Sequence, residues 1–406
     1  MIERLKNICD YISRGATPDY VDDSPYKVMN QATFSKGFID ETNLRYSSKN
    51  PYGAQIHKGD LLMASTGGGI LGKVVYFDKD EKDFYADSHV SILRNSKGTN
   101  LMKFLYYYFL IRYDEINATM VKGSTNQTEL QRNYLVNYEL DIPSLPVQRR
   151  IVSYLDSKTS AIDHAISLLE RKREAYTRLK ASVINRAVTR GLNPNVKIKD
   201  SGVEWIGKIP EGWKVKRFKE IFTKYTTGAT PNSKNVDNFE GNNTWVTIAD
   251  MTTKYVTESN LCLSDKSIKE NQIPITRKGS LMFSFKLSIG KVAFASKDLF
   301  TNEAIVTLSP SKKYDLDYFY YYLPLVCDNN ATENIYGAKM MNQKIIANMS
   351  FALPPLPEQR SIASYLDAEC SKIDRAASIV EKQIDAYKRL KRSLINEVVT
   401  GKRKVD

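Results

Sequence analysis

The chain has 406 residues, of which 42% are hydrophobic and 11% aromatic, and it carries 59 Lys and Arg against 46 Asp and Glu. This length predicts more than one domain, and the aromatic content excludes a largely disordered chain. The apolar runs are too short to span a membrane, and four widely spaced cysteines indicate reduced thiols in the cytoplasm. The net charge of +13 favours a polyanionic partner, with nucleic acid first.

Residues 1–143 predict a first globular domain. Short apolar runs at 61–64, 73–77 and 90–93 are bounded by Gly, Asp and Ser, as strands are, and an apolar stretch near 101–118 predicts a helix. Mixed elements of this kind indicate an α+β domain with a curved or barrel-like sheet. The segment has a net charge of −1, so any basic groups that bind DNA must be confined to one face.

A long helix is predicted over 144–192. Pro146 stands at its start, where a missing amide donor costs nothing, and no Gly or Pro follows before Gly191. Apolar residues recur every seven positions, which is typical of a coiled-coil seam. The seam consists of Leu155, Ile162, Leu169, Tyr176 and Val183. The second seam position is mixed, with Ile151, Ala165 and Leu179 interrupted by Lys158 and Lys172.

The second half of the chain repeats this plan after a linker at 193–209. Residues 210–354 predict a second globular domain, and 355–406 predict a second long helix. Strands are expected at 281–285, 291–295 and 304–308, and a helix at 316–330. The long helices align without a gap at an offset of 211 residues, and about 25 of 45 positions are identical. The seam recurs as Leu366, Ile373, Val380, Tyr387 and Leu394.

The two globular segments are related more faintly. The run Gly-Ala-Thr-Pro at Gly15 recurs at Gly228, and Gly-Lys-Val at Gly72 recurs at Gly290. The simplest arrangement is two related α+β domains, separated by two long helices that form an antiparallel coiled coil with a pseudo-twofold relation between the halves. Ordinary amphipathic helices in separate domains are the alternative.

Two further motifs carry a resemblance to a known family. Leu-Pro-x-Gln-Arg opens both helices, at Leu145 and Leu356, and the stretch from Asp200 to Trp213 reads DSGVEWIGKIPEGW. Together with the duplicated plan, they resemble the specificity subunits of type I restriction–modification systems over nearly the whole chain. The first domain departs from the family pattern, because it lacks a Trp-Ile-Gly-x-Ile-Pro-x-x-Trp lead-in and starts directly at Ile2.

The resemblance implies a non-catalytic DNA-specificity subunit. Each globular domain would be a target-recognition domain for one half of a bipartite sequence in double-stranded DNA. The helices would set the distance between the halves and dock two modification (methyltransferase) subunits and up to two restriction subunits. Adenine methylation and ATP-dependent endonuclease activity, with S-adenosylmethionine, ATP and magnesium, would belong to those partners, and this chain would hold no cofactor.

The residues themselves predict neither a catalytic nor a metal site. The three histidines, His57, His89 and His164, lack metal-ligand spacing. The glycine-rich run 65–69 lacks the P-loop pattern, and a tight turn between strands is the better interpretation. A single-chain DNA methyltransferase or nuclease remains an alternative, as does a coiled-coil scaffold without a DNA role.

Polar and basic loop residues are the candidates for DNA contacts, since Lys binds phosphates while Asn, Gln, Ser and Thr read base edges. In the first domain the candidates are Lys27, Asn30, Gln31, Thr33, Ser65, Thr66, Lys73, Ser124, Thr125, Asn126 and Gln127. In the second they are Thr247, Asp250, Ser284, Lys286, Lys291, Lys339, Asn342 and Gln343. The tyrosine triplets at 106–108 and 320–322 lie in apolar helical stretches and predict core packing rather than base stacking.

Overall fold

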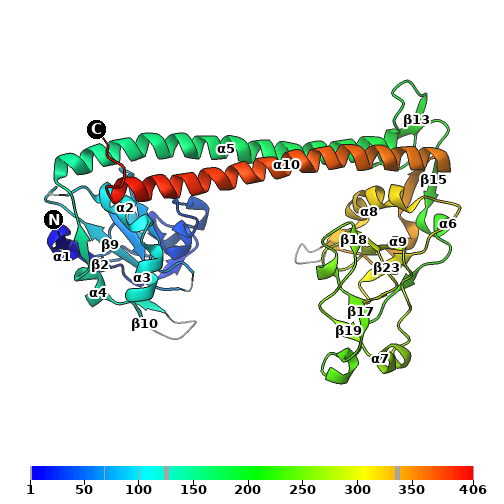
Figure 1. Ribbon diagram of the computed structural model, residues 1–406, viewed down its shortest axis with the longest axis horizontal. Coiled ribbons are helices and arrows are strands. Elements are labelled where there is room, and N and C mark those ends of the chain that lie inside the picture. Colours follow the sequence, from blue (N-terminus) through cyan, green and yellow to red (C-terminus); the bar gives the residue numbers. More distant parts are fainter. Residues whose placement is uncertain (1, 68, 99, 123–127, 334–338, 406) are drawn as a thin grey trace. The chain divides into compact units, whose positions relative to one another are not determined.

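The computed structural model describes residues 2–67, 69–98, 100–122, 128–333 and 339–405 (Figure 1). The chain divides into two compact units, one of residues 1–170 with 382–406 and one of residues 171–381. Each unit holds one globular domain and part of each long helix, α5 (Leu145–Arg190) and α10 (Leu356–Val399). Within the described ranges, no helix is both long enough and apolar enough to cross a membrane.

The first globular domain is built on two sheets. One is antiparallel in the order β2-β9-β6-β7, and the other has the order β3-β5-β4-β8, in which β4 and β8 are parallel. Their strands are β2 (Tyr11–Arg14), β3 (Tyr20–Val21), β4 (Tyr26–Met29), β5 (Arg45–Ser47), β6 (Leu61–Ala64), β7 (Val74–Tyr76), β8 (Phe84–Ala86) and β9 (Val90–Arg94). Two further antiparallel pairs are β1 (Ile2–Arg4) with β12 (Glu139–Asp141), and β10 (Val121–Lys122) with β11 (Glu129–Leu130).

Helices complete the core of this unit. They are α1 (Leu5–Ile8), α2 (Met102–Leu110), α3 (Tyr113–Thr119) and α4 (Arg132–Val136). Buried side chains of α2, β6 and β9 pack in one cluster with Leu155 of α5 and Leu394 of α10. The single helix predicted near 101–118 is wrong, because the chain turns between α2 and α3. There the amide of Arg112 donates to the carbonyl of Phe109, three residues back.

The second globular domain repeats the plan. Its sheets have the orders β16-β23-β20-β21-β18 and β19-β17-β22, with β17 and β22 parallel. Their strands are β16 (Thr226–Thr227), β17 (Asn243–Val246), β18 (Tyr255–Val256), β19 (Cys262–Leu263), β20 (Leu281–Ser284), β21 (Val292–Ala295), β22 (Phe300–Thr301) and β23 (Ile305–Leu308). The remaining pairs are β15 (Lys214–Arg217) with β26 (Ser350–Leu353), β24 (Thr332–Glu333) with β25 (Lys339–Met340), and β13 (Ile198–Asp200) with β14 (Lys208–Pro210). The helices are α6 (Phe218–Ile221), α7 (Asp265–Glu270), α8 (Leu316–Asn330) and α9 (Gln343–Asn348).

The predicted fold class is therefore confirmed, with two related α+β domains and two long helices. The Gly-Ala-Thr-Pro repeat has a structural explanation in this scaffold. A Cβ on Gly15 would lie 2.1 Å from the carbonyl oxygen of Ala86, and one on Gly228 would lie 1.9 Å from that of Thr301. Two backbone segments pass so closely at this point that only glycine fits.

The Leu-Pro-x-Gln-Arg motif plays the same part in both units. Gln148 is buried at the start of α5, where its Oε1 accepts from the amide of Leu101 at 2.9 Å. Its Nε2 donates to the carbonyl of a proline five residues earlier, also at 2.9 Å. Gln359 makes the same two bonds at the same distances, with the amide of Asp315 as donor. Each glutamine thus ties the start of a long helix to the segment that opens α2 or α8.

The two long helices lie side by side along the predicted seam in each unit (Figure 1). Two ion pairs show that they are antiparallel, since Arg173 of α5 pairs with Glu381 at 2.8 Å and Lys180 with Asp374 at 2.7 Å. Among the seam residues, Leu155, Ile162, Leu366, Ile373, Val380 and Leu394 are buried, Leu169, Tyr176 and Val183 are half-buried, and Tyr387 is exposed. The pseudo-twofold relation between the halves stays a prediction.

The second seam position differs from the expectation. Leu179 is 47% exposed, whereas Lys180, one residue later, is half-buried in its ion pair with Asp374. In α10, Ile384 is fully buried although it lies outside the predicted seam. The second seam position therefore follows the first by four residues rather than three, as Ile384 follows Val380. The apolar pattern in the sequence did not indicate this spacing, because lysines interrupt it.

Candidate nucleic-acid interface

Several candidate DNA-binding side chains cap short helical turns instead of facing outward. The Oδ1 of Asn30 accepts from the amides of Ala32 and Thr33 at 2.8 and 3.2 Å, and the buried Thr33 hydroxyl accepts from the amide of Asn30. In the second domain, a carboxylate oxygen of Asp250 accepts from the amide and the hydroxyl of Thr247 at 2.7 and 2.8 Å. Such local bonds are what short polar side chains form at turns, and they occupy these four groups.

Two of the candidate serines, Ser65 and Ser284, are buried and do not reach the surface. Ser65 shares a 2.6 Å hydrogen bond with Ser91, and the hydroxyl of Ser284 donates to the carbonyl of Ser288. Ser65 follows β6 and Ser284 ends β20, and because both are buried, neither hydroxyl is available to a partner. The described residues of the glycine-rich run 65–69 lie in the connection between β6 and β7, as predicted, and residue 68 is outside the described residues.

Four of the candidate lysines form ion pairs or hydrogen bonds within the domain. For the fifth, Lys286, the described contacts include neither. Lys27 pairs with Glu81 at 2.6 Å, and Lys339 forms an ion pair with Asp328. The ammonium groups of Lys73 and Lys291 donate to the backbone carbonyls of Ser35 and Ile248 at 2.7 and 3.4 Å, so both fasten a helical turn to its sheet. Lys286 is exposed, with its ammonium 5.6 Å from the centroid of the neighbouring Phe285 ring.

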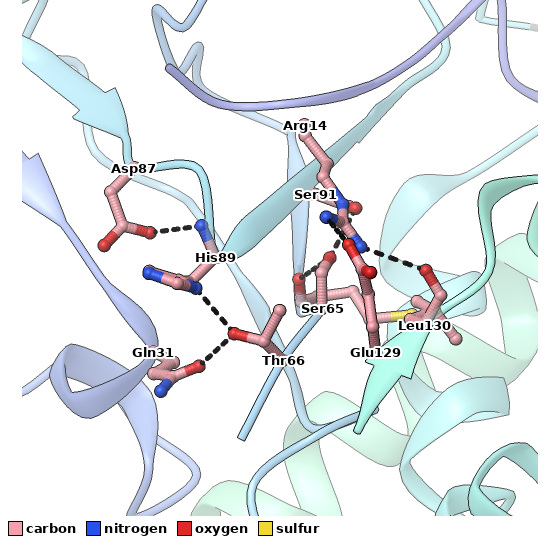
Figure 2. Close-up of polar contacts among 10 residues, drawn as sticks. Arg14, Gln31, Ser65, Thr66, Asp87, His89, Ser91, Glu129 and Leu130 are labelled. Atoms are coloured by element: carbon pink, nitrogen blue, oxygen red, sulfur yellow. Dashed lines mark hydrogen bonds and ion pairs between the residues drawn. The ribbon is translucent and has the colours of Figure 1, made fainter. Parts of the chain in front are cut away.

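Gln31 and Thr66 are brought together with a residue that the sequence did not single out for DNA binding. The hydroxyl of Thr66 donates to Oε1 of Gln31 at 3.1 Å, and it lies 2.7 Å from Nδ1 of His89. Figure 2 shows Thr66 between the other two side chains. Gln31 and Thr66 are half-buried and His89 is exposed, so this cluster, the Gln31–Thr66–His89 cluster, reaches the surface of the domain.

An ion pair flanks this cluster on the side of the hairpin β10–β11. Arg14 pairs with Glu129 and also donates to the carbonyl of Leu130 at 3.1 Å, as Figure 2 shows. Thr66 forms an antiparallel bridge with Glu129, which connects the turn after β6 to the same hairpin. The candidates Ser124, Thr125, Asn126 and Gln127 lie in the connection between β10 and β11, outside the described residues.

The buried Asp87 binds the backbone of the cluster at His89. Its carboxylate accepts from the amide of His89 at 2.8 Å and from the hydroxyl of Tyr20 at 3.2 Å. Burial raises the pKa of Asp87, since a charged carboxylate is poorly solvated there, and the bonds from His89 and Tyr20 only partly counter this. Burial and the nearby Asp87 charge raise the pKa of Tyr20 to about 12, so the phenol stays a donor at neutral pH.

In the second domain the polar candidates are spread over separate elements. Asn342 caps α9, where its Oδ1 accepts from the amide of Ile345 at 2.9 Å. Gln343, the first residue of α9, is exposed. No described contact joins either residue to Lys286, so the structure does not assemble these candidates into one cluster.

Backbone hydrogen bonds establish which residues correspond between the two domains. The amide of Asp87 donates to Met29 as that of Asn302 donates to Val246, and the amide of Ser65 donates to His89 as that of Phe285 donates to Ala304. From these bonds the counterparts of Gln31, Thr66 and His89 are Ile248, Lys286 and Ala304. The first domain therefore carries amide, hydroxyl and imidazole groups at these positions, whereas in the second domain Ile248 and Ala304 are buried and the Lys286 ammonium is exposed.

Sequence reasoning did not select His89 or Arg14 for DNA binding, because it considered histidine only as a metal ligand and sought candidates in loops, whereas Arg14 ends the strand β2. A signal was available for His89, which lies just before the strand β9 and thus at a turn of the sheet. Across the described ranges, no group of three or more His, Cys, Asp or Glu side chains is placed to hold a metal ion.

The fold and the site together define a protein with two versions of one recognition domain, each followed by a long helix. Residues 1–171 and 210–384 match the family described as type I restriction modification DNA specificity domain. The chain belongs to this family of type I restriction–modification specificity subunits.

Several relatives extend over most or part of the chain. A provisionally named type I restriction enzyme MjaX specificity subunit from Methanocaldococcus jannaschii is 24% identical and covers 100% of this chain and 93% of its own length. The type I restriction enzyme MjaIX specificity subunit of the same organism is 27% identical over 44% of this chain and 43% of that protein.

Solved structures show the same fold. A chain from a structure described for complex assembly and conformational transition of the type I R-M system has a TM-score of 0.74, at 18% identity over 98% of this chain and 97% of its own. The HsdS subunit from Thermoanaerobacter tengcongensis has a TM-score of 0.51, at 19% identity over 99% of this chain and 96% of its own.

Proposed function

We propose that this specificity subunit recognises a two-part target in double-stranded DNA, with one part read by each globular domain. It would present that target to two modification subunits and up to two restriction subunits. Those partners would supply S-adenosylmethionine for adenine methylation, and ATP with magnesium for cleavage. The place of action would be the cytoplasm, where that DNA lies.

The observation that carries this proposal is the difference between the two domains at equivalent turns. The Gln31–Thr66–His89 cluster offers hydrogen-bond donors and acceptors, whereas at the counterpart positions Ile248 and Ala304 are buried and only the Lys286 ammonium is exposed. Base edges are distinguished by their own donors, acceptors and methyl groups, so unlike side chains on one scaffold suit unlike base sequences. A target of two different parts follows from this arrangement.

Exchange of one domain tests the proposal. Residues 1–143 would be replaced by the equivalent domain of another family member, and the hybrid would be combined with its modification subunits. Methylation mapping of a genome should then show one part of the target changed and the other retained. As the matched control, exchange of 210–354 should change the other part only. A hybrid that alters both parts, or neither, would contradict the proposal.

The division of labour between the subunits needs a separate experiment. We expect the purified chain to bind duplex DNA but to transfer no methyl group from labelled S-adenosylmethionine. Transfer should begin when the modification subunits are added. Methyl transfer by this chain alone would overturn the proposal that catalysis lies in the partners.

A further inference from the structure

Two successive hydrogen bonds link the three side chains of the Gln31–Thr66–His89 cluster. A threonine hydroxyl has a single hydrogen, and here it is donated to Oε1 of Gln31. The lone pairs of Thr66 Oγ1 are then left to accept from Nδ1–H of His89, 2.7 Å away. The hydrogen bonds run in one direction, from His89 through Thr66 to Gln31.

In this arrangement Oε1, and not Nε2, is the carboxamide atom of Gln31 that faces Thr66. Thr66 occupies one of the two lone pairs of Oε1, and no contact among the described residues engages the other lone pair or the hydrogens of Nε2. Gly67 makes room for the carboxamide, because a Cβ there would lie 2.9 Å from Nε2 and 3.2 Å from Oε1 of Gln31. The carboxamide therefore offers an acceptor and a donor side by side.

We propose that Thr66 and His89 act as positioning residues that hold Gln31 to read an adenine in the major groove of the half-site bound by the first domain. An adenine edge presents an N6 donor and an N7 acceptor, which match Oε1 and Nε2 of a correctly turned glutamine. A carboxamide rotated by half a turn would place its donor and acceptor on the wrong atoms. This inference rests on the proposed function, since it assumes that the first domain reads one part of the target.

The second domain provides independent support. At the three corresponding positions it has Ile248, Lys286 and Ala304, on strands that are connected by the same backbone bonds, although the turn from β20 to β21 is two residues shorter than the turn from β6 to β7. The scaffold thus folds without the hydrogen-bonded series. Its presence in one domain alone points to recognition rather than to stability.

The experiment uses the complex with its modification subunits and a library of random duplexes, from which bound DNA is sequenced. Three variants are compared with the unmodified chain, namely Thr66→Val, Thr66→Ser and His89→Ala. Valine keeps the shape of threonine without the hydroxyl, whereas serine keeps the hydroxyl. Base preferences at the half-site of the second domain serve as the internal control in every sample.

We expect Thr66→Val to reduce the preference for adenine at one position of one half-site by about tenfold, the scale of a lost bidentate base contact. The Thr66→Ser variant should keep the preference for adenine, and the His89→Ala variant should weaken it at the same position. The other half-site should not change. A Thr66→Val profile like that of the unmodified chain, or an equal change in both half-sites, would overturn the inference while leaving the proposed function intact. Selection of no two-part target by the unmodified complex would instead overturn the proposed function.

Discussion

The hydroxyl of Tyr107 donates a hydrogen bond to Oδ1 of Asp156 at 2.6 Å, which joins the domain helix α2 to the long helix α5. Tyr321 and Asp367 repeat this bond at the same distance in the second unit. Burial, and then the bond to the carboxylate, raise the pKa of both phenols, so each stays a donor at neutral pH. One tyrosine of each triplet thus has the core position that was predicted, together with a specific partner on the long helix.

Replacement of Tyr107 by Phe should lower the stability of the first unit by about 1–2 kcal/mol, because it removes the bond to Asp156 and a 3.2 Å bond with the buried Thr159 hydroxyl. The loss stays small because Asp156 keeps its ion pair with Lys103 at 2.9 Å. Hydrogen exchange of the α2 amides measures the effect within that unit. Tyr52→Phe is the matched control, since Tyr52 is 98% exposed. Equal exchange rates in both variants would argue against a stabilising role for the bond.

Gly15→Ala should destabilise the first unit by about 3 kcal/mol or more, because the new methyl group would overlap the carbonyl oxygen of Ala86. Gly212→Ala adds the same methyl group where no atom lies within 4 Å, and it should be tolerated. Soluble yield and thermal unfolding of the two variants provide the comparison. A Gly15→Ala protein that unfolds at the temperature of the unmodified chain would disprove the close approach.

Asp87→Asn should stabilise the first unit at neutral pH. Because the folded-state pKa of Asp87 is raised above its ordinary value of 3.8, the folded protein binds this proton more tightly than the unfolded chain. Stability from this group is therefore present at low pH and is lost as the pH rises through the raised value. The second domain already has Asn302 at this position, where its Oδ1 accepts from the amide of Ala304 at 3.2 Å.

Unfolding of the Asp87→Asn variant and the unmodified chain would be measured as a function of pH. The difference between the two should be largest near neutrality and should disappear below the ordinary pKa of the carboxyl group. A variant less stable than the unmodified chain at neutral pH would show that the charge of Asp87 is compensated by its surroundings.

Ile384→Ala should cost about 2–5 kcal/mol, the range for deletion of a fully buried aliphatic side chain. Asp163→Asn, which removes the partner of Lys391 in the same part of the helix pair, should cost less than about 1 kcal/mol because both groups are partly exposed. Hydrogen exchange along α10 distinguishes the two effects. A larger loss from Asp163→Asn would mean that ion pairs, rather than apolar packing, hold the helices together.

Affinity for duplex DNA should fall steeply with salt, because each phosphate contact releases a bound cation. Lys286 is an exposed lysine on the counterpart of the Thr66 turn, and its ammonium forms no ion pair among the described residues. Lys286→Ala should therefore reduce the slope of log affinity against log salt concentration by about 0.9 if it contacts a phosphate. Fluorescence anisotropy across a salt series gives both slopes. Lys266→Ala, on the exposed helix α7 in the same domain, is a charge-matched control.

The amino-acid sequence was sufficient to predict the repeated architecture. Three patterns were enough, namely the repeat at an offset of 211 residues, the heptads and the strands bounded by glycine. Each is local or self-similar, so it can be recognised without knowledge of the fold. The strand predicted at 61–64 and the helix predicted at 316–330 match β6 and α8. The break between α2 and α3 was missed, because the apolar side chains continue through it.

The tertiary structure alone decided which polar residues act together. Gln31, Thr66 and His89 come from three separate turns, and only the pairing of strands between them brings their side chains within hydrogen-bond distance. It also engaged the side chain of Asn30 in a cap and placed Ser65 in a buried hydrogen-bonded pair. Amphipathic periodicity depends on neighbours along the chain, whereas the convergence of loops depends on contacts between residues far apart, and no local pattern encodes it.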